Sequence, residues 1–351
     1  MKIVHAVYSL EMGGAEVLVG QLCRSQRAAG HDVSVLAYSK LGVIGEALRA
    51  EGFDIQILGE AHPLVTVRRY FQRFRKSKPD VVHCHNVAPT IQAAAAARLA
   101  GVRRVITTRH RLELHPYDAA QELKYNLAGW FCDWIAGICE ITCVGIRAGR
   151  FARRNRVVLV YNGTSPVERT DSLAKRGFTL LFVGRLAREK DLATLIRAVA
   201  LAAGRVPELE LWIVGSGAER EALEALTREL ALSDRVRFHG QQTDTAPFFS
   251  AADAFVMSSI SEGLPMSLLQ SMSLGTPAIL TDVDGMGEVL RLTHSGLLVP
   301  PGDPAAFAEA IVKLAHDPAL QAELSSRAKE AYATRFALET MSEAYLRLYQ
   351  A

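Results

Sequence analysis

Short apolar runs alternate with stretches of helical spacing along the chain, and this alternation limits the fold more than any other feature. Five such runs occur in the first 110 residues: "KIVHAVYSL", "DVSVLAY", "FDIQIL", "PDVVHCH" and "RRVITTRH". Each is followed by a helical pattern, as in residues 15–29 and 90–100. Strands that alternate with helices are typical of parallel sheets with crossover helices. This part of the chain therefore predicts a doubly wound α/β domain.

The same alternation restarts in the second half of the chain. Six further runs predict strands: "FTLLFVGRL", "ELWIVGSG", "VRFHG", "AFVMSS", "PAILTD" and "GLLVP". The polar stretch 163–177 separates the two series and reads as a linker. We therefore expect domains at 1–162 and 178–335, and a helical pattern over residues 305–351 with a break at Pro318. Two such domains place ligands at the carboxyl ends of their strands, in a cleft.

The composition is that of a soluble globular protein, with 351 residues, 49% hydrophobic and 22% charged. Five cysteines are an odd number without metal-site spacing, which favours a reducing compartment and buried thiols. The opening residues "MKIVHAVYSLEMGGAE" read as a first strand rather than a signal peptide, so we expect a cytoplasmic protein. Asp133 and Glu140 interrupt the longest apolar stretch, 127–146, which excludes it as a transmembrane helix.

The net charge of +3 conceals an asymmetry. Residues 1–160 contain 22 Lys/Arg and 13 Asp/Glu, a balance of +9, whereas the remainder is acidic. Basic residues cluster at 68–78 and 147–156, which indicates either a surface for an anionic membrane or two solvated helix faces. Nucleic acid is the weakest alternative, because no platform of interleaved aromatic and basic residues is present.

Glycines follow two of the predicted strands. Gly13 and Gly14 lead into a helix, an arrangement that lets backbone amides approach a phosphate. The pattern does not match G-x-G-x-x-G, and the second strand ends without the acid that would hold a ribose, so a dinucleotide cofactor is disfavoured. Gly215 and Gly217 fit a structural turn or a second phosphate loop.

Two charged or titratable pairs remain to be explained. Arg185 and Lys190 follow a strand in "FVGRLAREKD" and together could neutralise a diphosphate without a metal, although isolated surface charges would look the same. His83 and His85 alternate on "DVVHCH", so both point to one face. Metal binding there would need further ligands, and we expect a role in the core or in lining the cleft.

The order of several motifs is similar to one family. "GRLAREKD", "GSGAERE", "HGQQTDTAPFFSAAD", "SEGLPMSLLQSMSLGTPAI" and "TDVDGMGEVL" resemble the nucleotide-binding half of family 4 glycosyltransferases. "GGAE", "DVVHCHN", "TTRH" and "VYNGT" resemble the acceptor half. The resemblance spans nearly the whole chain. It implies the GT-B architecture, in which two Rossmann-like domains face a central cleft and the last helix, here 336–351, packs back on the N-terminal domain.

The resemblance also implies roles for individual residues. Family members carry two glutamates separated by seven residues; Glu262 matches the first, near the transferred sugar, and Gln270 replaces the second, at the ribose. Pro265 can open a helix whose first amides aim at the diphosphate. The implied catalytic residues are Glu262, His110, Arg185 and Lys190; the implied donor-binding residues are Gly13, Gly14, Gly263, Leu264, Met266, Ser267, Gln270 and Glu288.

The stretch "DVDGMGE" departs from the family pattern. Asp282 and Asp284 imitate the D-x-D metal site of the other major glycosyltransferase architecture, but their place after a late strand argues against that function. Asp284 replaces an expected glycine, and Glu288 keeps the family's acid, which would bind the donor or cap a helix.

The implied reaction is retaining transfer of a sugar from a nucleotide diphosphate sugar, with uridine a guess from family frequency, to a hydroxyl of a lipid-linked or cell-surface glycan precursor. No metal or cofactor is expected, and no nucleic acid. The basic N-terminal domain suggests contact with the anionic inner face of the plasma membrane. The alternatives are a catalytically weak nucleotide-sugar binder and a nucleotide-sugar epimerase or hydrolase.

Overall fold

The computed structural model describes residues 1–110, 118–170 and 173–351. The chain divides into two compact units. The first contains Met1–Thr164 and Leu338–Ala351, and the second contains Ser165–Ala337. Each unit holds one parallel sheet with helices between successive strands, which confirms the prediction of two doubly wound α/β units.

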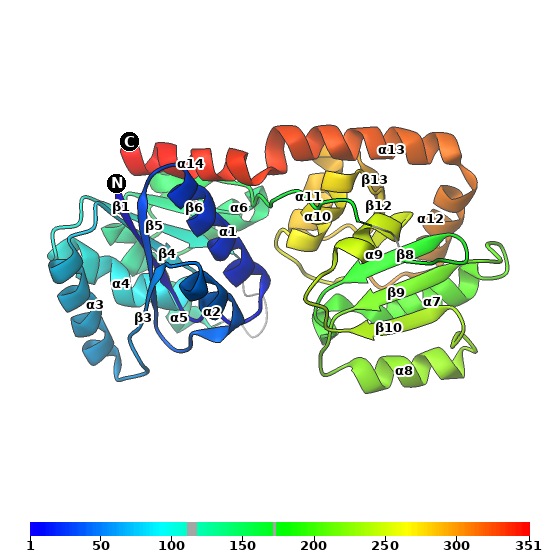
Figure 1. Ribbon diagram of the computed structural model, residues 1–351, viewed down its shortest axis with the longest axis horizontal. Coiled ribbons are helices and arrows are strands. Elements are labelled where there is room, and N and C mark those ends of the chain that lie inside the picture. Colours follow the sequence, from blue (N-terminus) through cyan, green and yellow to red (C-terminus); the bar gives the residue numbers. More distant parts are fainter. Residues whose placement is uncertain (111–117, 171–172) are drawn as a thin grey trace. The chain divides into compact units, whose positions relative to one another are not determined.

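The first unit is built on a parallel sheet with the strand order β3-β2-β1-β4-β5-β6-β7 (Figure 1). Its strands are β1 (Lys2–Val7), β2 (Asp32–Ala37), β3 (Asp54–Ile57), β4 (Val81–His85), β5 (Arg104–Arg109), β6 (Trp134–Gly137) and β7 (Val157–Leu159). Its helices are α1 (Gly14–Ala28), α2 (Gly42–Ala50), α3 (Pro63–Ser77), α4 (Val87–Leu99), α5 (Ala119–Ala128), α6 (Glu140–Ala148) and α14 (Leu338–Gln350). All five predicted strands are present. The pattern missed β6 and β7, which have only four and three residues.

The two faces of this sheet differ in chemistry. Val82 and Cys84 of β4 join an apolar core with Tyr70 and Phe74 of α3. Because side chains alternate along a strand, the histidines of β4 lie on the opposite face, toward α1 and α14. That face carries the buried polar groups described below.

The second unit has a six-stranded parallel sheet in the order β10-β9-β8-β11-β12-β13. Its strands are β8 (Thr179–Val183), β9 (Glu210–Val214), β10 (Val236–Gly240), β11 (Ala254–Met257), β12 (Ala278–Thr281) and β13 (Gly296–Val299), all six as predicted. Its helices are α7 (Leu192–Ala202), α8 (Arg220–Glu229), α9 (Ala246–Ala251), α10 (Met266–Leu274), α11 (Asp284–Thr293), α12 (Pro304–His316) and α13 (Pro318–Ala331).

The tail breaks where the sequence predicts. Pro318 begins α13, and the Asp317 carboxylate accepts a hydrogen bond from the backbone N–H of Leu320 at 2.9 Å. The chain then returns to the first unit, where α14, red in Figure 1, lies among the blue and cyan elements. The Tyr349 hydroxyl of α14 contacts Gln26 of α1, so the last helix packs on the N-terminal unit as expected.

All five cysteines are buried free thiols, as predicted. Within the described ranges, no helix has the length and apolar character needed to cross a bilayer.

Candidate active site

The loop between β11 and α10 carries most of the candidate residues of the second unit. Glu262, Gly263 and Leu264 lie in this loop, and α10 begins at Met266. Pro265 is the cap residue and provides no side-chain hydrogen bond to the helix. The first N–H groups of a helix lack intrahelical acceptors and carry the positive end of its dipole. The start of α10 therefore presents donors suited to an anion such as phosphate.

Two polar side chains continue this surface along α10. Ser267 and Gln270 are half-buried and, three residues apart, share a face of the helix, whereas Leu268 and Leu269 point into the core. Within the described part of the chain, the Gln270 carboxamide makes no hydrogen bond, whereas its backbone carbonyl accepts one from Ser273 Oγ. A half-buried carboxamide that makes no hydrogen bond to the described residues can bind a polar ligand.

An ion pair joins Glu262 to Lys190. Their side chains are only 19% and 12% exposed, so each charge stabilises the other in a place with little water. The backbone around Lys190 is held to the end of β11. Ser258 Oγ donates to the carbonyl of Lys190 at 3.0 Å, and the N–H of Ile260 donates to the carbonyl of Glu189 at 2.9 Å. The structure thus brings together two residues to which the family motif gives separate roles.

Arg185 lies in the loop after β8 and has a different environment. Its side chain is 67% exposed and pairs with Glu189 at 2.9 Å. A Cβ on Gly215 would lie 1.9 Å from the carbonyl oxygen of the residue before Arg185, and one on Gly217 would lie 2.1 Å from that of the residue after it. These glycines therefore allow the turn after β9 to pack directly on the Arg185 loop, which favours the structural interpretation of that turn.

Asp284 holds the loop that carries Glu262. Its φ of 40° lies in the left-handed region, where glycine is expected, and aspartate is among the few other residues that adopt it. Its Oδ2 accepts hydrogen bonds from the backbone N–H of Glu262 at 3.0 Å and from Ser261 Oγ at 2.8 Å. Asp282 pairs with Arg291. Both carboxylates of the D-x-D sequence are thus engaged by other groups of the protein, and the absence of a metal function stays a prediction.

Glu288 lies one turn inside α11, four residues after Asp284. Val283 occupies the cap position of this helix. Of the two roles that the sequence leaves open for Glu288, a cap of α11 does not match this position, and donor binding stays a prediction.

In the first unit, Gly13 and Gly14 form the start of α1. Gly13 is the cap residue with an extended backbone, and Gly14 is the first helical residue. A Cβ on Gly13 would lie 2.3 Å from Oε2 of Glu16, so the glycine leaves room for that carboxylate. Burial raises the pKa of Glu16. The predicted phosphate loop therefore lies beside the acidic side chain of Glu16, the last residue of the "GGAE" motif.

His110 directly follows β5 and is only 8% exposed. Its backbone N–H donates to Oδ1 of Asn86 at 3.0 Å. Asn86 follows β4 with a φ of 68° and a ψ of −174°, a strained conformation that is used almost only by glycine. Nε2 of the His110 ring lies 3.1 Å from Nδ1 of His85. Nδ1 of His110 has no hydrogen-bond partner among the described residues.

The contact with His85 is the start of a buried chain of hydrogen bonds. His85 Nε2 lies 2.9 Å from Nδ1 of His5, and His5 Nε2 lies 2.9 Å from Oε1 of Gln26. The other end of the Gln26 amide, Nε2, donates to the Tyr349 hydroxyl at 3.1 Å.

A second arm leaves the Tyr349 hydroxyl. It runs to His83 Nδ1 at 2.7 Å, from His83 Nε2 to Thr108 Oγ1 at 2.7 Å, and from Thr108 Oγ1 to the Tyr345 hydroxyl at 2.9 Å. His83 and His85 thus lie in the core, one of the two roles that the sequence predicts for them.

Burial keeps these imidazoles uncharged. Desolvation lowers the pKa of His5 and of His110 to about 4, and lowers the pKa of His83 and of His85 well below 6.5. At neutral pH each ring therefore has one N–H donor and one lone-pair acceptor.

The ligand atoms of His5, His83 and His85 lie within 4.8 Å of one another, as in a metal site. Their ring nitrogens are already engaged with one another or with Gln26, Tyr349 and Thr108. A cation would replace these hydrogen bonds without a carboxylate in the set to balance its charge. The cluster therefore fits a hydrogen-bonded chain better than a metal site.

A hollow of about 440 Å³ in the second unit is lined by Lys175, Asp253, Pro277 and Ser325, among others. It contains none of the candidate residues. We therefore place the candidate site by the chemistry of its residues and not by the size of this hollow.

Comparison with known proteins identifies the family. Residues 12–168 match the family described as "Glycosyltransferase Family 4", and residues 167–331 match "Glycosyl transferases group 1". EpsD of Bacillus subtilis is 31% identical over 290 residues, which cover 76% of each chain. The chain belongs to the family 4 glycosyltransferases.

Two other similar proteins extend this result. The lipopolysaccharide core biosynthesis glycosyltransferase LpsE of Rhizobium meliloti is 38% identical over 200 residues, which span 56% of this chain and 58% of LpsE. The crystal structure of HepE from Anabaena in complex with UDP has a TM-score of 0.87 and 19% identity over the full length of both chains. At this identity HepE shows the fold, and it supports the GT-B architecture of this glycosyltransferase.

The family motifs located His110 in this glycosyltransferase but not the residues that hold it. Gln26 and Tyr349 belong to no motif, and their contact joins helices that are more than 300 residues apart in sequence. One signal was available: parallel strands buried on both faces are usually apolar, and His5 and Thr108 interrupt β1 and β5 on the face that also carries His83.

Proposed function

We propose that this family 4 glycosyltransferase transfers a sugar from a uridine diphosphate sugar to a hydroxyl of a lipid-linked or cell-surface glycan precursor. The anomeric configuration is retained and no metal takes part. The observation that carries the proposal is the start of α10, where helix N–H groups lie beside the shielded Lys190–Glu262 pair.

The donor is assigned to the second unit. The N–H groups at Met266 and Ser267 bind the diphosphate, together with Lys190 and the mobile fork of Arg185. A diphosphate offers Lys190 a second anionic partner, so the Glu262 carboxylate becomes available to the hydroxyls of the sugar. Gln270 binds the ribose through its amide, and Glu288 contributes from α11.

The chemistry follows from these charges. The bond between the anomeric carbon and the β-phosphate oxygen breaks, and the acceptor oxygen bonds to the same face of that carbon. The acceptor proton moves to the leaving phosphate oxygen. Arg185, Lys190 and the α10 dipole stabilise the negative charge of the leaving group, and Glu262 stabilises the positive charge at the anomeric carbon. His110, neutral at pH 7, accepts a hydrogen bond from a sugar hydroxyl.

Two relatives motivate the choice of substrates. HepE was crystallised with UDP, which supports uridine as the base. LpsE carries a name that places it in lipopolysaccharide core biosynthesis, which supports a glycan acceptor.

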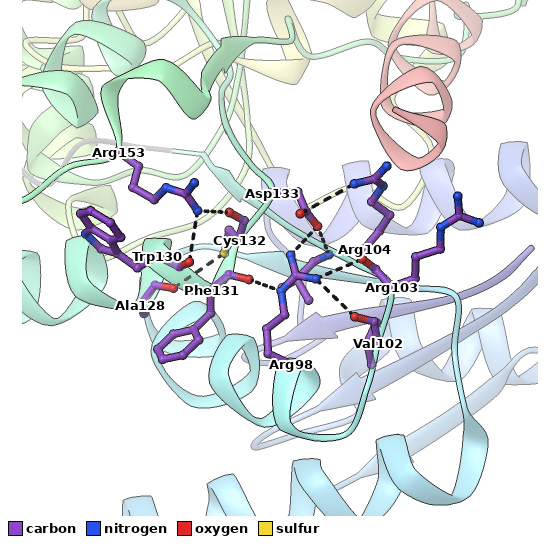
Figure 2. Close-up of polar contacts among 11 residues, drawn as sticks. Arg98, Val102, Arg103, Arg104, Ala128, Trp130, Phe131, Cys132, Asp133 and Arg153 are labelled. Carbon is purple, nitrogen blue, oxygen red and sulfur yellow. Dashed lines mark hydrogen bonds and ion pairs between the residues drawn. The ribbon is translucent and has the colours of Figure 1, made fainter.

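The acceptor class further suggests a protein that works at the inner face of the plasma membrane, and the first unit carries a surface suited to it. Trp130, Phe131 and Phe151 are 58%, 42% and 53% exposed. Figure 2 shows Arg153 beside Trp130, and it shows Arg98, whose Nε donates to the carbonyl of Phe131, paired with Asp133. Aromatic side chains favour the bilayer interface, and each basic residue near anionic lipid contributes about 1 kcal/mol. We call Trp130, Phe131, Phe151 and Arg153 the aromatic–arginine surface.

Vesicle co-sedimentation tests the membrane contact. Binding should need anionic lipid, weaken with salt, and fall when Phe131→Ser and Phe151→Ser are combined. Leu201→Ser, at an exposed leucine of the second unit, is the matched control and should bind as the unchanged protein does. Equal binding to neutral vesicles, or no effect of the double variant, would contradict the contact.

A panel of nucleotide sugars with and without a glycolipid acceptor extract tests the reaction. Nucleoside diphosphate release that needs the acceptor supports transfer. Release without any acceptor favours the epimerase or hydrolase alternative, and binding without turnover favours the weak binder, an alternative prompted by Gln270 and Asp284.

A further inference from the structure

Gln26 lies where the two arms of the buried hydrogen-bonded chain meet. One arm runs through His5 and His85 to His110, and the other begins at Tyr349. An amide is the one group in this chain whose ends are not interchangeable, because its nitrogen only donates and its oxygen only accepts. Gln26 can therefore impose a direction on its neighbours.

The direction of the histidine arm follows from Gln26. Because Oε1 faces His5 Nε2, that nitrogen carries the proton and His5 Nδ1 is an acceptor. Nε2 of His85 must then donate to it, which leaves His85 Nδ1 as an acceptor for the Nε2–H of His110. Each ring is neutral and has only one proton to give. Nδ1 of His110 is consequently left as a bare lone pair.

The second arm is compatible with the amide in this orientation. Nε2 of Gln26 donates to the Tyr349 hydroxyl, which is then free to donate to Nδ1 of His83. His83 Nε2 in turn donates to Thr108. With Gln26 in this orientation, every hydrogen bond of the second arm has one donor and one acceptor.

We propose that Gln26 is a positioning residue that sets the tautomer of His110 through His5 and His85, so that His110 offers a bare Nδ1 to a sugar hydroxyl. His110 Nδ1 is buried without a partner among the described residues, a state that is costly unless a ligand completes it. It lies at the carboxyl end of β5, where doubly wound sheets bind their ligands. The identity of the hydroxyl rests on the proposed function, whereas the tautomer itself does not.

Nuclear magnetic resonance of the full chain labelled with 15N at histidine measures the tautomer directly, since protonated and bare ring nitrogens have well-separated frequencies. The signal that disappears in His110→Gln assigns His110. In the unchanged protein we expect the proton on Nε2 of His110. The tautomer of the unchanged protein can therefore be measured with no variant other than His110→Gln.

Two substitutions at Gln26 then test its control of the tautomer. Gln26→Met has a similar length but no amide, so His5 loses its acceptor and the arm should reverse, with the proton of His110 on Nδ1 in most molecules. Gln26→Glu keeps an acceptor oxygen toward His5 and should retain the original tautomer. With an active donor and acceptor, Gln26→Met should lower kcat about ten-fold or more with little change in donor KM, and Gln26→Glu should restore kcat.

Three results would overturn the proposal. They are a proton on Nδ1 of His110 in the unchanged protein, a His110 tautomer that is the same in Gln26→Met and Gln26→Glu, and stoichiometric binding of Zn²⁺ by His5, His83 and His85. If the tautomers follow Gln26 but no nucleotide sugar is turned over, the tautomer assignment stands and the proposed function fails.

Discussion

Three candidate residues of the second unit, Lys190, Glu262 and Arg185, are charged and partly accessible, whereas His110 of the first unit is neutral and buried. Lys190 and Glu262 form an ion pair beside the start of α10, and Arg185 extends into solvent. His110, by contrast, ends a chain of uncharged imidazoles whose pKa values are all lowered by burial.

This difference matches two kinds of ligand. A diphosphate carries charge and favours cations and helix N-termini. A sugar hydroxyl is neutral and is oriented by a directed hydrogen bond, which an uncharged imidazole of defined tautomer provides. We infer that the second unit stabilises charge and that the first unit orients a hydroxyl.

Removal of the shielded cation should have the largest effect. Lys190→Ala deletes a cation of the diphosphate site and leaves Glu262 without its ion-pair partner, so turnover should fall by about 10²-fold or more. Steady-state kinetics with the donor and acceptor found by the panel measures this loss.

Arg188→Ala is the matched control, because Arg188 lies in the same turn but is exposed. It should keep nearly full turnover. Near-normal turnover in Lys190→Ala would contradict the inference that the second unit stabilises charge.

Acid should destabilise the first unit more than a unit without buried histidines. The folded-state pKa of His5 and of His110 is about 4, below the ordinary value of 6.5, so the unfolded chain binds more protons between these values. The free energy of unfolding should therefore fall as pH decreases from 6.5 toward 4, by about 1.4 kcal/mol per pH unit for each such histidine.

Urea unfolding of a Trp212→Phe variant measures this, since its remaining tryptophans, Trp130 and Trp134, report only the first unit. His62→Gln, at an exposed histidine, should leave the slope unchanged. A free energy of unfolding that is flat over this range would show that the histidine chain is not neutral and buried.

Substitutions of Asp284 test how the loop that carries Glu262 is held in place. Asp284→Ala removes the carboxylate that makes a φ of 40° tolerable for a residue with a Cβ and leaves the N–H of Glu262 without its acceptor, which should cost about 2 kcal/mol of unfolding free energy in the second unit. Asp284→Gly removes the carboxylate but relieves the backbone, so its loss should be smaller. Fluorescence of Trp212 during urea unfolding, in a protein that also carries Trp130→Phe and Trp134→Phe, measures both losses. Equal losses would contradict the backbone argument.

Gln270→Glu should have the smallest effect. A carboxylate at this position of α10 can accept charge-assisted hydrogen bonds from ribose hydroxyls, so UDP should bind more tightly by about 1 kcal/mol, roughly five-fold. Calorimetric titration with UDP measures the change, and Gln270→Leu should weaken binding instead. If neither variant altered the affinity, the side chain would not contact the nucleotide.

The sequence predicted the local features of this fold because they depend on local patterns. Apolar runs located eleven strands, and Pro318 marked the break in the tail. It missed β6, which lies inside the apolar stretch 127–146, and β7, which has only three residues. The motif around Glu262 was found for the same reason: its residues are close in sequence and follow one strand.

The polar chain behind His110 could not be predicted in this way. Its direction depends on Gln26 of α1 and Tyr349 of α14, which meet only because the last helix packs against the first unit. Likewise, the pairing of Lys190 with Glu262 depends on contacts between β11 and a turn about 70 residues earlier, which no local pattern encodes.

The most direct test of this division of roles between the units measures UDP affinity and turnover in two variants. Lys190→Ala should weaken UDP binding, because the cation that faces the diphosphate is lost. His110→Gln should leave UDP affinity unchanged and lower only turnover. If His110→Gln weakened UDP binding as much as Lys190→Ala did, the assignment of charge to one unit and hydroxyl orientation to the other would be wrong.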